Sequence, residues 1–300
     1  MGRIRLKVPR ERNLMDGGKF VERLERKVLK TIEEYGLLRR GEKVVVGASG
    51  GKDSTTLLYI LKKYGYDVEA LHVDLKLGDW SKKCLANLKQ FCEENEIKLH
   101  VIDVQKELGS PLCEIVEIVR SKRKVRDCSI CGVIRRWLIN REAKRLGAKK
   151  VATGHNLDDE AQTILMNLFL GNLKANTMLG PKVGIREIEG LVQRVKPLYF
   201  CTEEETKLYS KLMGFPITYD PCPRVMDTLR RDVKKWLEAL EKEGPGIKLR
   251  LVEEVLKLKN ELVRKVVKGE LRYCKICEEP SSKEVCKSCQ LLLTYFGGSG

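Results

Sequence analysis

The stretch VVVGASGGKDSTTLLYIL, Val44 to Leu61, decides the fold. A β-branched run leads into a glycine-rich turn, and an amphipathic segment follows, so we expect a buried strand, a tight loop and a helix. Backbone N–H groups in such a loop can approach an anion closely, and the helix presents its positive end to the same anion. The stretch departs from the pattern G-x-x-x-x-G-K-[ST], because Asp53 follows Lys52 where Ser or Thr should stand.

The polar residues of this loop suit a nucleotide phosphate. Lys52 adds positive charge, and Ser54 can cap the helix or hydrogen-bond a phosphate. Asp53 would repel a phosphate unless it held Mg²⁺, which would bridge the two groups. The alternative is a glycine-rich turn in which Asp53 and Ser54 only cap a helix. Five specialised residues in a row after a strand favour the phosphate site.

Strands and helices alternate after the loop, which predicts an α/β fold whose parallel sheet is covered by helices on both faces. We expect strands near 43–49, 68–75, 98–104 and 149–154, and helices near 53–64, 81–95, 132–146 and 158–170. Residues 171–190 are rich in Gly and Asn and predict a long loop beside the site. Thr202 and Glu205 form the pattern of a helix-capping box.

The chain divides into four regions by composition. Residues 1–40 are basic with apolar residues at helical spacing, which predicts an N-terminal helical arm. Residues 41–222 form the nucleotide-binding domain, and 223–268 form a basic helical region interrupted at 244–246. Residues 269–295 form a cysteine module.

The composition is that of an ordinary globular domain, with 42% hydrophobic and 33% charged residues in 300. No apolar run approaches the roughly 20 residues of a membrane span, and the basic N-terminus has no apolar signal core. The eleven cysteines in such a chain favour metal or redox chemistry over disulfides. We therefore expect a cytoplasmic protein that has no contact with membranes.

Positive charge is concentrated in one tract. The formal net charge is +16, and Val119–Lys150 holds 12 Lys or Arg against 2 Asp or Glu. A tract this one-sided repels itself unless a polyanion relieves it, so nucleic acid is the leading partner. A solvated, lysine-rich surface is the alternative.

The loop and a second motif resemble a known family. SGGKDS, Ser49 to Ser54, resembles the loop of the PP-loop ATP pyrophosphatases, which adenylate a carbonyl oxygen on a Rossmann-like fold and release pyrophosphate. The stretch CSICGVIRRWLINREAKRLGAKKVATGHNLDDEAQTILMNL, Cys128 to Leu168, resembles tRNA 2-thiolation enzymes. It is nearest to the TtuA-like and wobble-uridine branch and further from the TtcA branch. The resemblance implies ATP-dependent conversion of a tRNA uridine to 2-thiouridine with release of AMP.

The resemblance also implies a sulfur centre at Cys128, Cys131 and Cys222. Three thiolates can hold three irons of a [4Fe–4S] cluster and leave the fourth open, or one thiolate can carry a persulfide. Neighbouring arginines would stabilise thiolates, whereas buried inert cysteines are the alternative. The family further implies a thiocarboxylated ubiquitin-like protein as sulfur donor. A homodimer is also considered.

The implied nucleotide site has two halves. The first is the loop itself, comprising Ala48, Ser49, Gly50, Gly51, Lys52, Asp53 and Ser54. The second faces it across ATP and comprises His72, Gly154, His155, Asn156 and Asp159. Lys52, Asp53 and Asp159 are the expected catalytic residues beside the three cysteines, with Asp159 a candidate Mg²⁺ ligand. The alternative for Asp158 is that it only caps the helix. The alternative for His72 is a purely structural role at the end of its strand.

The C-terminal sequence CKICEEPSSKEVCKSC predicts a closed zinc ribbon with the ligands Cys274, Cys277, Cys286 and Cys289. No cysteine precedes Cys84, so the N-terminal zinc finger usual in relatives is not expected. How tRNA docks therefore stays open. The tRNA position that is thiolated (54, 34 or, less favoured, 32) also stays open. Four other cysteines are expected in the core: Cys84, Cys92, Cys113 and Cys201.

We expect tRNA phosphates to contact the basic residues that flank the first cysteine pair: Lys122, Arg123, Lys124, Arg126, Arg135 and Arg136. Two alternative functions would require only some of these motifs. Another PP-loop reaction, such as amidation or lysidine synthesis, needs no trio of thiolates. A non-catalytic subunit that binds tRNA and presents sulfur needs no intact loop with Lys52 and Asp53.

Overall fold

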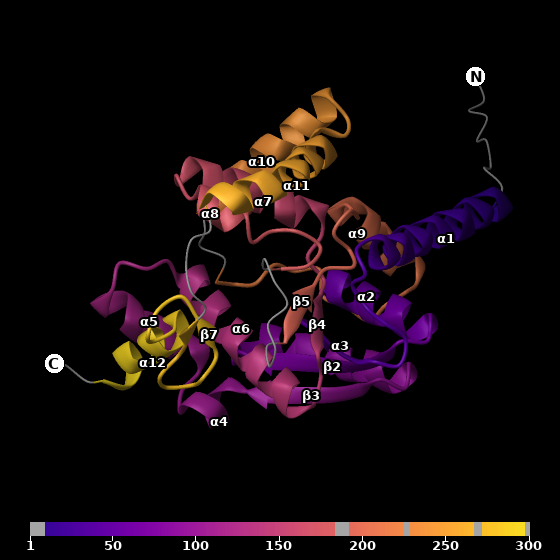
Figure 1. Cartoon of the computed structure of the whole chain (residues 1–300). Coiled ribbons are helices and arrows are strands. Elements are labelled where there is room, and N and C mark those ends of the chain that lie inside the picture. The colour runs from indigo at the N-terminus through magenta and orange to yellow at the C-terminus, as the bar shows by residue number, and fades with distance from the viewer. Residues whose placement is uncertain (1–9, 184–191, 225–227, 267–271, 298–300) are drawn as a thin grey trace, which may run out of the picture.

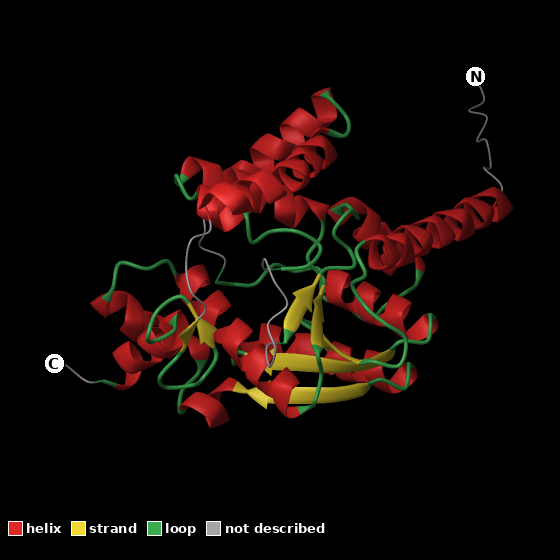
Figure 2. Ribbon diagram, in the orientation of Figure 1, coloured by secondary structure: helices red, strands yellow, loops and turns green. Residues whose placement is uncertain are grey.

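The computed structural model describes residues 10–183, 192–224, 228–266 and 272–297. Its main sheet is parallel and has the order β3-β2-β1-β4-β5. The strands are β1 (Lys43–Gly47), β2 (Asp67–Asp74), β3 (Lys98–Asp103), β4 (Lys150–Thr153) and β5 (Gln193–Val195). A small antiparallel sheet pairs β6 (Arg272–Tyr273) with β7 (Pro280–Ser281). The predicted α/β class with a parallel sheet is confirmed (Figure 2).

Helices cover both faces of the main sheet because successive strand residues point to opposite sides. Val44 and Val46 of β1 belong to one core cluster, and Val45 belongs to the other. The first cluster packs against α1 (Arg10–Glu34), α2 (Lys52–Lys63), α3 (Gly78–Glu94) and α9 (Glu203–Leu212). The second packs against α4 (Val104–Leu108), α5 (Leu112–Lys122), α6 (Asp127–Arg145) and α12 (Lys287–Phe296).

A further group of helices lies above the sheet in Figure 1. It comprises α7 (Leu157–Phe169), α8 (Leu173–Asn176), α10 (Thr228–Glu243) and α11 (Ile247–Val266). Leu157, Val233 and Val252 share its buried core. The predicted interruption at 244–246 separates α10 from α11. The helix α8 falls within the loop expected at 171–190, of which 184–190 lie outside the described residues.

The N-terminal helix α1 is built into the main core. Leu24, Val28 and Ile32 are buried in the first cluster, and the carboxylate of Glu25 is buried beside them. That carboxylate accepts hydrogen bonds from Lys63 Nζ at 2.7 Å and from Tyr209 Oη at 2.7 Å. The second half of the expected arm is therefore fixed to α2 and α9.

Helix α6 begins at Asp127, so the expectation that it begins at Gly132 is wrong. Asp127 stands in the first turn, where its negative charge stabilises the positive end of the helix. The preceding helix α5 was not anticipated, although Ile115, Val116 and Val119 are buried at helical spacing. Among the described residues, no helix is both long and apolar enough to span a bilayer.

Candidate functional site

The glycine-rich loop and the segment after β4 meet at the carboxyl edge of the sheet. They lie between β1 and β4, where the strand order changes direction and where α/β folds place ligands. A Cβ on Gly154 would stand 2.8 Å from the backbone nitrogen of Ser54. Gly50 has φ +78°, and a Cβ there would stand 2.6 Å from the carbonyl oxygen of Cys84. Glycine at both positions therefore allows the two loops and α3 to touch.

Asp53 is the centre of a hydrogen-bond network in this crevice. Its Oδ2 accepts from Lys52 Nζ at 2.7 Å, and its Oδ1 accepts from Asn156 Nδ2 at 3.2 Å and from Thr206 Oγ1 at 2.6 Å. Lys52 Nζ also lies 3.4 Å from Glu203 Oε1. Burial works to lower the pKa of Lys52, but the carboxylates of Asp53 and Glu203 outweigh it and raise that pKa. Lys52 is therefore a fixed cation.

Asn156 and Asp159 form the capping box of α7. Asn156 Oδ1 accepts from the Asp159 backbone nitrogen at 3.1 Å, and Asp159 Oδ2 accepts from the Asn156 backbone nitrogen at 3.3 Å. The second carboxylate oxygen of Asp159 lies 3.5 Å from Arg230 Nη1. Protein atoms surround Asp159 although water can reach it, and this burial raises its pKa despite Arg230.

The alternative that Asp158 caps α7 is wrong. Its buried carboxylate accepts from the backbone nitrogen of Glu203 at 2.7 Å and pairs with Lys248 Nζ. Since that nitrogen lies at the start of α9, Asp158 joins α7 to α9 and α11.

Glu203, Thr206 and Arg230 contact the candidate catalytic residues but were not predicted. The signal for the first two was available, because the capping box at Thr202 and Glu205 is confirmed and begins α9. Because α9 begins beside the glycine-rich loop, the side chains of its first turn reach that loop. Nothing in the local sequence indicated Arg230.

The two candidate histidines differ in their surroundings. His72 is buried at the end of β2 with Nδ1 2.8 Å from the carbonyl oxygen of Ala48, so Nδ1 carries the proton. Its Nε2 is therefore an acceptor, and it has no partner among the described residues. Burial lowers the pKa of His72. Solvent reaches His155, yet the surrounding protein atoms and then Lys196 lower its pKa to about 3, so the ring is neutral.

The three cysteines of the expected sulfur centre lie on two separate segments. Cys128 and Cys131 occupy the start of α6, and Cys222 lies in the loop before α10. Cys128 is exposed and the others are half-buried. Burial raises the pKa of Cys131, Arg135 opposes this, and the other two thiols raise it further, so all three act on one another. Their sulfur atoms are not all within 4.8 Å.

Helix α3 holds the segment that carries the third cysteine. Trp80 Nε1 donates to the carbonyl oxygen of Asp220 at 3.1 Å, and Asn87 Nδ2 donates to Thr218 Oγ1 at 3.2 Å. These donors share one face of α3 with Cys84, whose backbone touches the glycine-rich loop. One helix therefore fixes both the loop and the cysteine segment. Cys84, Cys92 and Cys201 are buried, as expected of core residues, whereas the same expectation for Cys113 is wrong because it is only half-buried at the start of α5.

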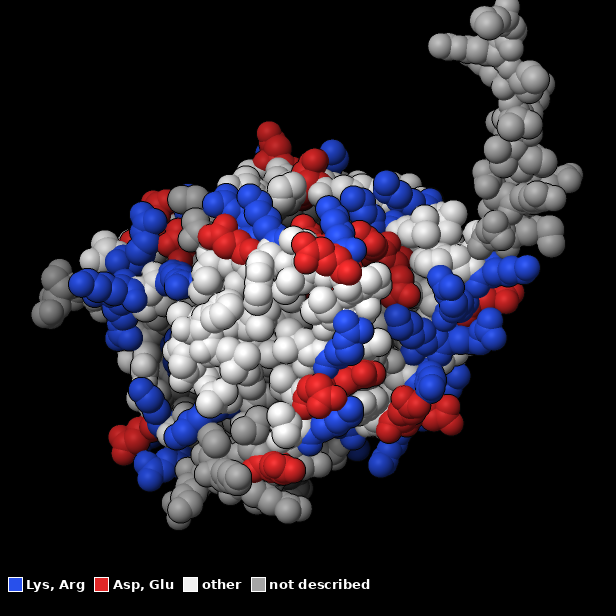
Figure 3. Space-filling view, turned by 90° about the horizontal axis from the view of Figure 1, so that it is seen from above, with Lys and Arg blue, Asp and Glu red and all other residues white. Residues whose placement is uncertain are grey.

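The predicted RNA-binding residues are all exposed, four of them at the turn from α5 to α6 and two, Arg135 and Arg136, in the third turn of α6. Lys122 Nζ donates to the carbonyl oxygens of Thr294 and Gly297 at 3.3 and 3.2 Å, which ties the turn to α12. Arg224, next to the cysteine segment, pairs with Glu117 of α5 at 2.9 Å. Lys and Arg gather along the left edge of Figure 3, the side on which α5 and α12 lie in Figure 1.

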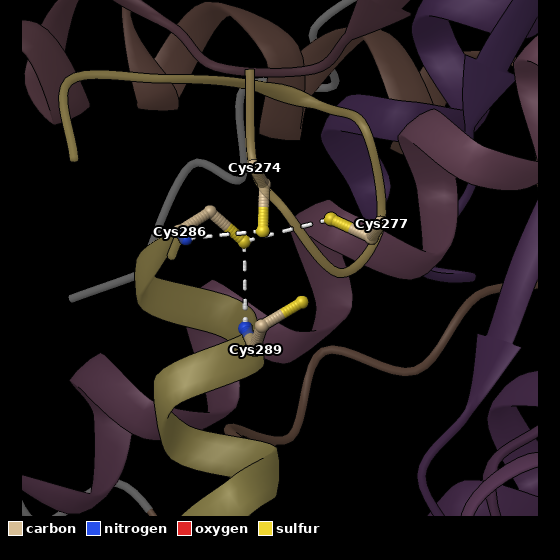
Figure 4. Close-up of side chains that lie close together, drawn as sticks. All are labelled: Cys274, Cys277, Cys286 and Cys289. Carbon is tan, nitrogen blue, oxygen red and sulfur yellow. Dashed lines mark hydrogen bonds between the residues drawn. The ribbon is translucent and has the colours of Figure 1, made fainter. Parts of the chain in front are cut away.

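The C-terminal cysteines form a compact group. Cys274, Cys277, Cys286 and Cys289 have all four sulfurs within 4.8 Å of one another, the only such group of potential metal ligands in the described part of the chain. Their side chains point toward one another from the turn and from the start of α12 (Figure 4). The Cys286 backbone nitrogen donates to Cys274 Sγ at 3.2 Å. Four converging thiols fit the tetrahedral preference of zinc.

Comparison with known proteins agrees with these features. The family profile described as the PP-loop domain matches residues 20–237. A tRNA-5-methyluridine(54) 2-sulfurtransferase of Pyrococcus horikoshii is 36% identical over 90% of this chain and 85% of its own. Its counterpart in Thermotoga maritima is 38% identical over 91% and 88%. The structure of the U34-tRNA thiolase NcsA from Methanococcus maripaludis with its [4Fe-4S] cluster superposes with a TM-score of 0.78 at 32% identity, covering 92% and 88%.

Proposed function

The chain belongs to the PP-loop ATP pyrophosphatases and, among them, to the tRNA 2-thiolation proteins, and on this premise we propose that it is an ATP-dependent enzyme that converts a tRNA uridine to 2-thiouridine. The observation that carries the proposal is the position of α3. It touches the nucleotide loop at Gly50 and bonds to the segment of Cys222, so nucleotide and thiols share one edge of the sheet.

In the nucleotide half, Lys52 is a fixed cation suited to bind phosphate oxygens, and the loop supplies backbone N–H groups. The carboxylates of Asp53 and Asp159 both bond to Asn156, so they lie together and provide the oxygen ligands that Mg²⁺ prefers. When bound, Mg²⁺ would neutralise phosphate charge. The free Nε2 of His72 can accept a hydrogen bond from the adenosine moiety.

In the sulfur half, Cys128, Cys131 and Cys222 form a set that is open to solvent and wider than one ion requires. Such a set fits a [4Fe–4S] cluster with three protein ligands, which when bound would offer one iron to external sulfur. A persulfide on one thiol is the alternative. Arg135 favours the thiolate form of Cys131. The C-terminal quartet would hold zinc.

The partners follow from the same chemistry. We propose tRNA as substrate, a thiocarboxylated ubiquitin-like protein as sulfur donor and a homodimer as the assembly. A cytoplasmic location suits the cysteines, because none of the eleven is paired in a disulfide, as expected in a reducing compartment.

The test follows two products in one reaction. Lys52→Ala should abolish both AMP, measured by chromatography, and 2-thiouridine, measured by mass spectrometry of the tRNA. Lys62→Ala, on the exposed side of the same helix, is the matched control and should retain both. Formation of 2-thiouridine by Lys52→Ala would contradict the proposal. Binding of tRNA without AMP formation by the unaltered chain would favour the non-catalytic subunit.

A further inference from the structure

Three arginines lie on or against helix α6 beside the first cysteine pair. Cys128, Gly132, Arg136 and Asn140 follow one another at intervals of four residues, so they form one face of α6. A Cβ on Gly132 would stand 3.0 Å from Arg136 Nη1. The guanidinium of Arg136 therefore folds back over the glycine toward the cysteines, the direction that helical side chains favour.

A second guanidinium reaches this face from the sheet. Arg194 Nη2, from β5, donates to Asn140 Oδ1 at 2.9 Å. After burial, the charge of Arg136 is the main cause that lowers the pKa of Arg194, so the two guanidinium groups lie close enough to repel each other although their elements are far apart in the sequence. Arg135, adjacent to Arg136, completes the group. No sequence pattern predicted a role for Arg194.

These charges oppose one another and lack carboxylate partners. Among the described residues, none of the three arginines forms an ion pair. Burial and then Arg135 lower the pKa of Arg136, and burial and then Arg136 lower the pKa of Arg194 to about 10. Glu279 opposes this effect on Arg194 but does not reverse it. Like charges held close together without carboxylates to neutralise them destabilise a fold, and an anion between them would relieve the repulsion.

We propose that Arg135, Arg136 and Arg194 form a phosphate subsite beside the cysteine centre, and that it binds one phosphodiester of the RNA next to the target uridine. The proposal rests on the proposed function. Guanidinium forks match phosphate oxygens in paired hydrogen bonds. Arg136 begins about 8 Å along the helix axis from Cys131, close to where sulfur would be transferred.

The RNA backbone is favoured over ATP as the source of this phosphate. The nucleotide loop already has its own cation, Lys52, and its own backbone donors. A base that must leave its stack to react needs the adjoining backbone held in place, because phosphate contacts fix position and orientation. A phosphate subsite between the cysteines and the sheet edge would hold the RNA backbone in this way.

The experiment uses tRNA stem-loops that differ only in one neutral methylphosphonate, placed in turn at each linkage around the target uridine. Affinities are measured by fluorescence anisotropy with the full chain. One linkage should stand out in the unaltered protein, with about a tenfold loss of affinity. Arg194→Gln should weaken binding of the unmodified RNA by a similar factor, and the methylphosphonate at that linkage should then cause no further loss.

The controls separate the possible sources of phosphate. Lys124→Gln, on the exposed turn before α6, should weaken all RNAs alike and keep the response to that linkage. The affinity of Arg194→Gln for ATP and for pyrophosphate should be unchanged, and its melting temperature should match that of Arg194→Lys. Loss of nucleotide binding with intact RNA binding would overturn the RNA assignment. If Arg194→Gln bound RNA as tightly as the unaltered protein, the phosphate subsite would be wrong and the proposed function would stand. If the unaltered protein bound no RNA, both the subsite and the proposed function would be wrong.

Discussion

The molecule holds two groups of cysteines that differ in almost every physical respect. The quartet at 274–289 comes from one short stretch, and its sulfurs already converge. The trio of Cys128, Cys131 and Cys222 comes from two distant segments, with one thiol exposed and the sulfurs further apart. Backbone nitrogens donate to the quartet's sulfurs, whereas the charges of Arg135 and Arg136 act on Cys131 of the trio.

This difference indicates two kinds of site. Four converging thiols satisfy one metal ion and leave no position for a substrate, so the quartet suits a structural role. The trio depends on the tertiary fold for its assembly, remains accessible and lies beside the nucleotide loop. A site of this kind suits chemistry, since reacting groups must be reached by a substrate.

The largest expected effect is on the quartet. Cys274→Ser should remove the metal and unfold the residues around it, because the binding free energy of a structural zinc site, on the order of 10 kcal/mol, is folding free energy. Leu291 and Leu292 of α12 are buried against α5 and α6, so the melting temperature of the whole chain should fall. Elemental analysis and thermal unfolding measure both changes. Ser282→Ala, in the turn between the cysteine pairs, is the control.

If Cys274→Ser kept its zinc and its melting temperature, the closed structural role of the quartet would be wrong. A loss of iron instead of zinc would show that the two groups had been assigned to the wrong metals.

The second effect concerns the trio and should spare the fold. Cys131→Ser should lose iron and lose 2-thiouridine formation below detection, while zinc content and ATP affinity stay unchanged. The fold should survive because serine is close to cysteine in size and Cys131 is only half-buried at the margin of the second core cluster. Cys92→Ser serves as the control, because its buried thiol belongs to the first core cluster, whereas Cys131 packs against the second. Unaltered 2-thiouridine formation by Cys131→Ser would remove the cysteine trio from the mechanism.

The same contrast explains how much of the site could be predicted from the sequence. The quartet and the capping box at Thr202 follow from local patterns, and the loop at Ser49–Ser54 follows from strand, turn and helix order. Joining Cys222 to the first pair needed the family resemblance. The contact between Thr206 and Asp53 spans 153 residues, and no local pattern specifies such a contact. Arg194 was missed for the same reason.

The smallest expected effect tests whether α3 positions Cys222. Trp80→Phe keeps the aromatic ring but removes the hydrogen bond from Nε1 to the carbonyl oxygen of Asp220. That carbonyl lies at the surface, so water can take the place of the lost donor and the melting temperature should fall by no more than about 2 °C. A hydrogen bond of this kind contributes about 1 kcal/mol, so a less well-held Cys222 should lower the rate of 2-thiouridine formation by about fivefold. ATP affinity should be unaltered.

A second measurement distinguishes positioning from a general loss of activity. In metal-free protein, iodoacetamide should alkylate Cys222 faster in Trp80→Phe than in the unaltered chain, because the cysteine segment is freer to move away from α3. Cys128 should react at the same rate in both, since its helix does not depend on Trp80. Trp236→Phe, an exposed tryptophan on α10, should change neither rate. Equal alkylation of Cys222 in all three proteins, with full thiolation, would mean that α3 does not set the geometry of the trio and that the loop before α10 holds Cys222 by its contact through Arg224 to α5.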